Sequence, residues 1–334
     1  MWRKAGRLAL LLAGIGLGII LLLPHLGEVG PTLRRVGWGF LGGLLSSALV
    51  YLLDAWAWRQ AFLVNQPAVS FWKLFNVRMA GEALNRITPL ASMGGEPLKG
   101  YLLSQNGSTL SDAVASVAIT KNIMTQAQIG FIFLGVALAL GLLPGRVDLL
   151  GFALFPGLIL AAMLVTAVLD LRLRRLRKEG KEPLAGVGGG RAARMRKAAA
   201  EFWEVVADFI WTNPRGYLRS LIAFFLGWLA GAIELFVYAG ALGLPLSLIE
   251  AIVLEALVCS VTMATFFIPA NAGSQEGGMA FVGQLFRLGS PDALAFAVLR
   301  RGREAFWVLY GLSYLGLTQG RVLLQPPDPE QSPA

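Results

Sequence analysis

The sequence predicts an all-α polytopic membrane protein with about six full spans plus two re-entrant helical hairpins arranged as an inverted repeat. Three observations predict this fold: the composition, the lengths of the apolar runs, and a polar pattern that occurs twice. Of the 334 residues, 56% are hydrophobic and 15% are charged, and the mean hydropathy is +0.63. Because ordinary soluble domains are about one quarter charged, the composition excludes that class and favours a single membrane domain over residues 1–334.

Apolar runs of about 20 residues are long enough to cross the hydrocarbon core of a bilayer as helices. Such runs predict full spans near residues 7–26, 36–60, 111–142, 148–169, 217–242 and 292–318. The first run follows basic residues, as in a signal peptide, but it lacks a small-residue cleavage site and leads into more membrane sequence. We therefore expect it to be an uncleaved span.

Two further segments do not fit as lipid-facing spans. Residues 68–103 are too polar and are interrupted between Pro89 and Gly95, whereas residues 246–285 are more apolar and are broken from Pro269 to Gly278. Proline and glycine leave backbone hydrogen-bonding groups without a partner in the helix. In lipid such groups are tolerated only where protein or a water-filled cavity receives them. We interpret both segments as helix–turn–helix hairpins that enter and leave on the same side of the membrane.

The two breaks share one pattern, in which a proline is followed by glycine and, seven residues after the proline, by a carboxylate. This places Glu96 and Glu276 at equivalent positions, and we call the sequence separation between them the repeat offset. The same offset pairs Asp54 with Glu234 and Lys121 with Arg301. The hairpin turns are predicted at Pro89, Gly94, Gly95, Pro269, Gly273 and Gly277. We interpret the pattern as a duplication, with halves at 36–142 and 216–322.

The distribution of charge predicts the topology. The net charge is +9, and many basic residues crowd the 170–216 loop, which the positive-inside rule places in the cytoplasm. With both termini inside, the first hairpin enters from the cytoplasm and the second from outside, so the halves are inverted, as in many transporters. Residues 143–215 would then hold a linking span, the basic loop and a surface helix, and 323–334 a disordered tail. The expected location is the inner (cytoplasmic) membrane, and no nucleic-acid partner is expected.

Basic residues near the hairpins indicate an anion-binding cavity. The order Gly95-Glu96-Pro97 is typical of a helix start, whose free N–H groups attract anions. A phosphate head group is the ligand that such a site favours. The residues expected to bind it are Arg86, Lys99, Lys121, Arg300 and Arg301.

Four carboxylates are candidates for gating or coupling: Glu96, Glu276, Asp54 and Glu234. They could couple transport to protons or cations, bind a cationic part of the substrate, or gate by alternating their pairing with the arginines. The alternative is purely structural, since buried charge is costly unless paired, and these carboxylates would then only neutralise nearby cations.

Two stretches, Gly81 to Leu103 and Ile268 to Gly278, resemble the flippase-like membrane family formed by the transmembrane region of lysylphosphatidylglycerol synthases. The most specific string is Asn85-x3-Pro89-x4-Gly94-Gly95-Glu96-Pro97, and it adds Asn85 to the expected substrate-binding residues. The resemblance implies movement of lipids between leaflets. It does not carry over synthase activity, which in aminoacylating members belongs to a soluble domain outside this sequence.

The sequence thus favours a flippase or scramblase for a phospholipid or polyprenyl-phosphate-linked lipid, without a cofactor or metal. No P-loop is present, so we expect no direct use of ATP. Alternatives are a membrane enzyme transferring a glycosyl or phosphoryl group on a lipid carrier, a scaffold subunit that binds lipid-synthesis enzymes, and a transporter of soluble ions. The oligomeric state, the lipid and the direction of movement are not encoded in any motif.

Overall fold

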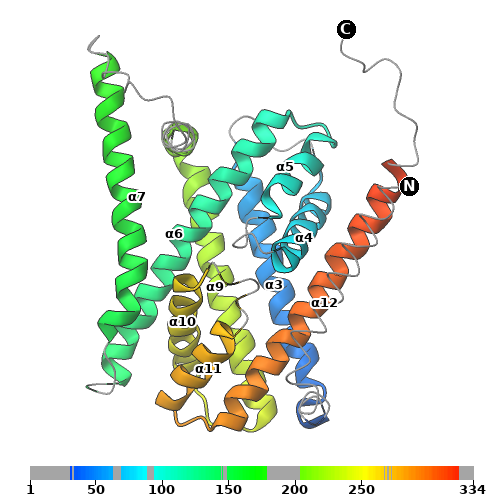
Figure 1. Ribbon diagram of the computed structural model, residues 1–334, viewed down its shortest axis with the longest axis vertical. Coiled ribbons are helices and arrows are strands. Elements are labelled where there is room, and N and C mark those ends of the chain that lie inside the picture. The colour runs from blue at the N-terminus through cyan, green and yellow to red at the C-terminus, as the bar shows by residue number, and fades with distance from the viewer. Residues whose placement is uncertain are drawn as a thin grey trace.

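The computed structural model describes residues 31, 34–62, 69–88, 94–143, 145, 149–178, 204–266, 268, 271 and 273–322 (Figure 1). These residues form helices and turns and contain no strand, which confirms the all-α prediction. The predicted first span at 7–26, most of the basic loop, the tail at 323–334, Pro89 and Pro269 lie outside the described residues.

The helices correspond closely to the predicted segments. They run in the order α3 (Gly39–Gln60), α4 (Phe71–Ile87), α5 (Glu96–Ser104), α6 (Leu110–Leu142), α7 (Leu149–Lys178), α9 (Pro214–Leu242), α10 (Leu248–Ala264), α11 (Ser274–Leu285) and α12 (Ser290–Val322). Residues 204–212 are also helical. We refer to α3 to α6 as the first helix group and to α9 to α12 as the second helix group.

Three helices, α3, α6 and α9, are long and apolar enough to cross a membrane. In α7 the apolar part is the shorter stretch Leu149–Val165. Helix α12 is 33 residues long, but Arg300, Arg301, Arg303 and Glu304 interrupt its apolar character. The chain is therefore a helical membrane protein, and the number of full spans stays a prediction.

Each predicted hairpin consists of two short helices that contact one another. Helix α4 packs against α5, and α10 packs against α11. In Figure 1 the α4–α5 pair lies toward the upper end of the molecule and the α10–α11 pair toward the lower end. The first break falls where the sequence predicted it, between Ile87 and Glu96. The second lies between Ala264 and Ser274, so α11 begins before the predicted end of the break at Gly278.

Helices α4, α6, α9 and α10 begin at polar caps, which satisfy N–H groups that have no partner within the helix. Ser70 Oγ accepts from the N–H of Lys73, and Thr109 Oγ1 accepts from the N–H of Asp112. At the start of α10, Ser247 and Glu250 form a reciprocal capping box. These local signals fix where α4, α6 and α10 begin.

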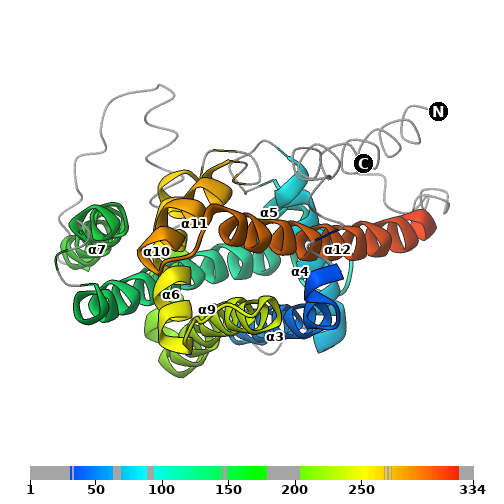
Figure 2. The same ribbon diagram turned by 90° about the horizontal axis from the view of Figure 1, so that it is seen from below.

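The two helix groups are interleaved. Helices α3 and α9 pack along much of their length and run antiparallel, since Gly39 lies beside Ala241 and Asp54 beside Gly227 (Figure 2). Helix α4 packs against α12, and α10 packs against α6. The second helix of each group therefore contacts the last helix of the other group.

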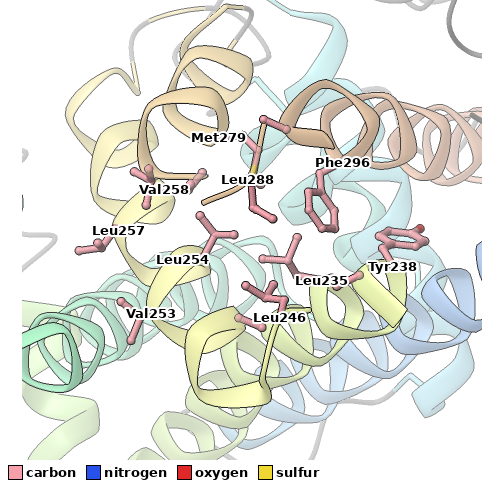
Figure 3. Close-up of a cluster of buried hydrophobic side chains, with 14 of the residues drawn as sticks. Leu235, Tyr238, Leu246, Val253, Leu254, Leu257, Val258, Met279, Leu288 and Phe296 are labelled. Atoms are coloured by element: carbon pink, nitrogen blue, oxygen red, sulfur yellow. The ribbon is translucent and has the colours of Figure 1, made fainter. Parts of the chain in front are cut away.

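Apolar side chains fill the contacts between these helices. Figure 3 shows Leu235 and Tyr238 of α9 together with Leu254, Met279 and Phe296 of α10, α11 and α12. Within a bilayer the hydrophobic effect contributes little to helix association, because lipid tails are as apolar as these side chains. Close packing and interhelical hydrogen bonds hold the helices together instead. On its outer surface α9 exposes an apolar stripe at helical spacings of three, four and seven residues: Leu218, Ile222, Leu226, Ile233 and Phe236.

Helices α4 and α12 come close together at Gly311. A Cβ atom at this position would lie 2.3 Å from the carbonyl oxygen of Met79 and 2.8 Å from Cβ of Ala83. One residue earlier, the Tyr310 hydroxyl donates to Asn76 Oδ1 at 2.6 Å. The backbone of α4 therefore leaves no room for a side chain at Gly311.

We predict that Gly311→Ala lowers the stability of the folded protein by about 1–3 kcal/mol, because the added methyl group overpacks the α4–α12 contact. The matched control is Gly316→Ala on the same helix, where a Cβ meets no atom within 4 Å. The midpoint of thermal unfolding in detergent measures both. Equal midpoints for the two variants would contradict the close approach.

Candidate functional site

A cavity of about 480 Å³ lies between the two helix groups. Its wall combines apolar side chains, such as Met79, Ile159 and Phe266, with polar and charged ones. The charged residues that line it are Asp54, Arg78, Glu82, Arg86, Lys121, Glu255, Arg300, Arg303 and Glu304. They come from α3, α4, α6, α10 and α12, so both helix groups build the cavity.

Helical spacing explains why these residues face one space. On α4, Arg78, Glu82, Asn85 and Arg86 recur at intervals of three or four residues, which places them along one side of the helix. On α12, Arg300, Arg303 and Glu304 follow the same rule. Amphipathic helices in water turn their polar stripe outward, whereas here the stripes face the inside of the helix assembly.

In the first helix group the charges form two sets of ion pairs, one around Arg78 and the other around Lys99. Arg78 Nη2 donates to Asp54 Oδ2 at 2.6 Å, and its guanidinium lies over the ring of Phe224. Lys99 Nζ donates to Glu82 Oε1 at 2.7 Å and to both carboxylate oxygens of Glu96 at 3.2 Å.

Glu96 is held at the beginning of α5 by several donors. Besides Lys99, Lys121 Nζ lies 3.8 Å from its Oε1, and Asn85 Nδ2 donates to the same oxygen at 3.2 Å. The Asn85 side chain also accepts from the N–H of Gly95 at 2.7 Å, which ties α4 to α5. A Cβ on Gly95 would lie 1.9 Å from the carbonyl oxygen of Gly81, so only glycine permits this approach.

In the second helix group Glu276 lies in the first turn of α11 as its third residue, whereas Glu96 is the first residue of α5. Glu276 Oε1 accepts from Arg301 Nε at 2.6 Å, and its Oε2 accepts from the N–H of Gly273 at 2.9 Å. Lys121 and Arg301 stand at the same distance in sequence after the carboxylates that they contact. The carboxylate–cation pair of the first group thus recurs in the second at the repeat offset.

The remaining pairs join α12 to its neighbours. Arg300 pairs with Glu255, and Arg303 Nη1 donates to Glu234 Oε2 at 2.5 Å. Glu304 accepts from Arg301 at 2.7 Å and from Arg86 at 3.0 Å. The bond from Arg86 crosses between the two helix groups.

The predicted site residues fall into two sets. Asp54, Asn85, Arg86, Lys121 and Arg300 line the main cavity. The others lie behind its wall and pair with residues of the network: Glu96, Lys99, Glu234, Glu276 and Arg301. Of the predicted hairpin turns, Gly94, Gly95 and Gly273 lie directly before α5 and α11, whereas Gly277 is the fourth residue of α11 and belongs to the helix.

The ion pairs described above contain as many cations as carboxylates. The cations are Arg78, Arg86, Lys99, Lys121, Arg300, Arg301 and Arg303, and the carboxylates are Asp54, Glu82, Glu96, Glu234, Glu255, Glu276 and Glu304. Isolated charges are expensive when they are buried among apolar helices, and pairing offsets that cost. Mutual neutralisation is therefore one role of the network.

Three charged side chains are nevertheless more open than the rest. The side-chain exposure is 32% for Arg86, 31% for Lys121 and 26% for Glu82, compared with 4% for Arg78 and 8% for Glu304. These three groups line the cavity and are available to a ligand. Cys259 also lines it, 5% exposed, with Sγ 3.7 Å from Glu255.

Sequence reasoning assigned no specific role to Arg78 or Gln275. Arg78 pairs with Asp54, and Gln275 Nε2 approaches Glu304 Oε1 at 3.4 Å. Arg78 could have been found, because it lies one turn before Glu82 on the polar side of α4. Gln275 carries no such periodic signal. Within the described residues, no group of three or more His, Cys, Asp or Glu side chains could hold a metal ion.

We predict that Arg301→Gln destabilises the folded protein by about 3–5 kcal/mol, because Glu276 loses its cation and Glu304 loses one of its cations. In the double variant Arg301→Gln/Glu276→Gln, one unpaired carboxylate is removed, so the total loss should be smaller than the sum of the two single losses. Thermal unfolding of all three variants measures the coupling. Simple additivity would show that the two side chains do not interact.

Comparison with known proteins agrees with the membrane character of the chain. The family model described as "Lysylphosphatidylglycerol synthase TM region" matches residues 8–312. A similar protein is the "UPF0104 membrane protein" of Methanothermobacter thermautotrophicus, 22% identical over 332 residues, with 92% of this chain and 93% of the relative covered. No solved structure matches the chain.

Proposed function

Because the chain belongs to the family of the lysylphosphatidylglycerol synthase transmembrane region, we propose that it is a lipid transporter. It acts as a flippase or scramblase that moves a phospholipid or a polyprenyl-phosphate-linked lipid between leaflets. The observation that carries this proposal is the cavity of about 480 Å³ between the helix groups, with charged and apolar side chains in one wall. A lipid needs both kinds of surface along its path, one for the head group and one for the first part of the tails.

The proposed transport path uses an inverted repeat in the inner membrane. Two facts support the repeat. Helices α6 and α12 are both 33 residues long, and their first residues, Leu110 and Ser290, are separated by the repeat offset. The carboxylate–cation pairs recur at that same offset. The opposite positions of the α4–α5 and α10–α11 pairs in Figure 1 support the inversion. Both pairs would be re-entrant hairpins, and both termini would be cytoplasmic.

The head group is proposed to bind at the open cations. Arg86 and Lys121 are the most exposed cations of the paired network, and Asn85 and Arg300 lie in the same wall. Arginine and lysine bind phosphate strongly through charge-assisted hydrogen bonds. Lys99 and Arg301 act from behind this wall, since they fix Glu96 and Glu276.

The carboxylates Glu96 and Glu276 are proposed to gate the path through their cations. The two equivalent pairs differ in length: Glu276 lies 2.6 Å from Arg301, whereas Glu96 lies 3.8 Å from Lys121. In an inverted repeat the halves exchange conformations during alternating access, so a tight pair on one side and a loose pair on the other fit one state of such a cycle. Asp54 and Glu234 keep Arg78 and Arg303 in place.

Reconstituted liposomes test the transport proposal. Acyl-chain-labelled phosphatidylglycerol and phosphatidic acid should move between leaflets faster with the protein than in empty liposomes. Arg86→Gln and Lys121→Gln should each slow this movement by about tenfold, the effect of losing a hydrogen bond to a charged group. Lys73→Gln, an exposed position on α4, makes the same change of charge and should not matter.

Wild-type rates equal to those of empty liposomes for several lipids would sink the transport proposal. Incubation of the same liposomes with labelled lipid donors distinguishes a transferase, because only an enzyme would generate a new lipid product.

The gate is tested by Glu96→Gln and Glu276→Gln. Each should abolish most of the movement, since each weakens one of the two equivalent pairs, while Asp112→Asn at the exposed start of α6 leaves the rate unchanged. Size-exclusion chromatography verifies that the variants are folded. If both folded glutamine variants transport at the wild-type rate, the carboxylates only neutralise charge.

A further inference from the structure

One ion pair connects the two helix groups across the cavity. Arg86 Nη1 of α4 donates to Glu304 Oε1 of α12 at 3.0 Å, although the residues are far apart in sequence. Both side chains line the cavity. The bridge lies near the end of α4, whereas the hydrogen bond between Tyr310 and Asn76 lies nearer its start, so the two mark different points along the α4–α12 contact.

Glu304 does not depend on Arg86 for its neutralisation. Its carboxylate also accepts from Arg301 at 2.7 Å, and Arg303 Nη2 lies 3.8 Å away. Glu304 is only 8% exposed, so losing its cation would be costly if it had only one. Here two cations remain beside Glu304 when Arg86 leaves. Arg86 can leave Glu304 without stranding a buried charge.

Arg86 is the partner suited to leave. With 32% of its side chain exposed, it faces the open space of the cavity while it is bound to Glu304. The Arg78–Asp54 pair differs, because Arg78 is 4% and Asp54 13% exposed, and separating them would leave a buried carboxylate without its closest cation.

The bridge also has no polar counterpart at the repeated positions. The repeat offset pairs Arg86 with Phe266 and Glu304 with Met124, and both of these apolar residues line the same cavity. At these two positions the wall is apolar, although Lys121 of α6 and Glu255 of α10 place charge elsewhere on the same side of the cavity. A lipid head group would lie between Arg86 and Lys121, with its tails against apolar side chains of the wall such as Phe266.

We propose that the phosphate of the transported lipid takes the place of Glu304 on Arg86, so that binding of the head group breaks the bridge between α4 and α12. This inference rests on the proposed function, because it assigns the head-group site of that transport path. Guanidinium binds phosphate through paired hydrogen bonds, so the phosphate supplies what the carboxylate gives up. Glu304 then remains with Arg301 and Arg303.

The exchange is tested by binding in detergent, without any transport step. The probes are dihexanoyl phosphatidic acid, dihexanoyl phosphatidylcholine and inorganic phosphate, with affinities from titration calorimetry. Glu304→Gln removes the competitor and should tighten binding of the phosphatidic acid by about tenfold. The variant should fold, since Arg301 keeps Glu276 and Arg303 keeps Glu234.

Two controls separate exchange from a general gain of positive charge. Glu82→Gln removes a carboxylate from the same cavity wall while Lys99 keeps Glu96, and it should change the affinity much less. In the background of Arg86→Gln, the gain from Glu304→Gln should vanish, because the competition is for Arg86.

The proposal is overturned if Glu304→Gln leaves the affinity unchanged or weakens it, if Glu82→Gln gives the same gain, or if the gain persists without Arg86. If Glu304→Gln tightens the binding of inorganic phosphate alone, the ligand of Arg86 is a free anion and not a lipid head group. Failure of transport in liposomes with the predicted pattern of binding would instead remove the proposed function and leave the ion exchange standing.

Discussion

Charge that is enclosed by apolar helices has to be neutralised by other charge, and the arrangement of this protein depends on that constraint. The paired network brings together side chains from α3, α4, α5, α6, α9, α10, α11 and α12. Most pairs join two different helices, whereas Lys99–Glu96 and Arg301–Glu304 each lie within one helix. Charge pairing thus supplies interhelical specificity where packing in lipid alone discriminates weakly.

A network in which every charge is paired disfavours ligand binding, because a charged ligand would first have to break an existing ion pair. Here the pairing is uneven. Some charges have one deeply buried partner, while Glu304 has several and Arg86 remains open to the cavity. Redundant partners lower the free energy needed to exchange one of them, so the same network that stabilises the fold contains a place where a ligand can enter.

The sequence predicted which segments form helices, because helix formation depends on local signals. Apolar runs indicated α3, α6, α7, α9 and α12, and the Pro–Gly breaks correctly separated α4 from α5 and α10 from α11. The limits of the helices differ from the predicted spans by a few residues, mainly because caps such as Thr109 and Asn213 set the start of α6 and α9. Crossing of the membrane by α12 cannot be read from length alone, since Arg300 to Glu304 disrupt its apolar run.

The candidate site was only partly predictable. The repeat offset identified Glu96 with Lys121 and Glu276 with Arg301 as equivalent pairs, but it gave no sign that Glu96 also binds Lys99 or that Glu276 lies behind the cavity wall. The Arg86–Glu304 bridge joins residues far apart in sequence, and only the packing of α4 on α12 brings them together. Pairings across helices follow from tertiary packing, which periodicity within one helix does not contain.

The single cysteine has a practical consequence for following the cavity. Cys259 is the one cysteine among the 334 residues, and it lines the space between the helix groups while almost fully covered. A thiol-specific reagent can therefore label the natural chain only at this point, without prior removal of competing thiols. Burial disfavours the reactive thiolate, so labelling of Cys259 is slow. A change in its rate at constant pH reports a change in how often the cavity admits a reagent from outside.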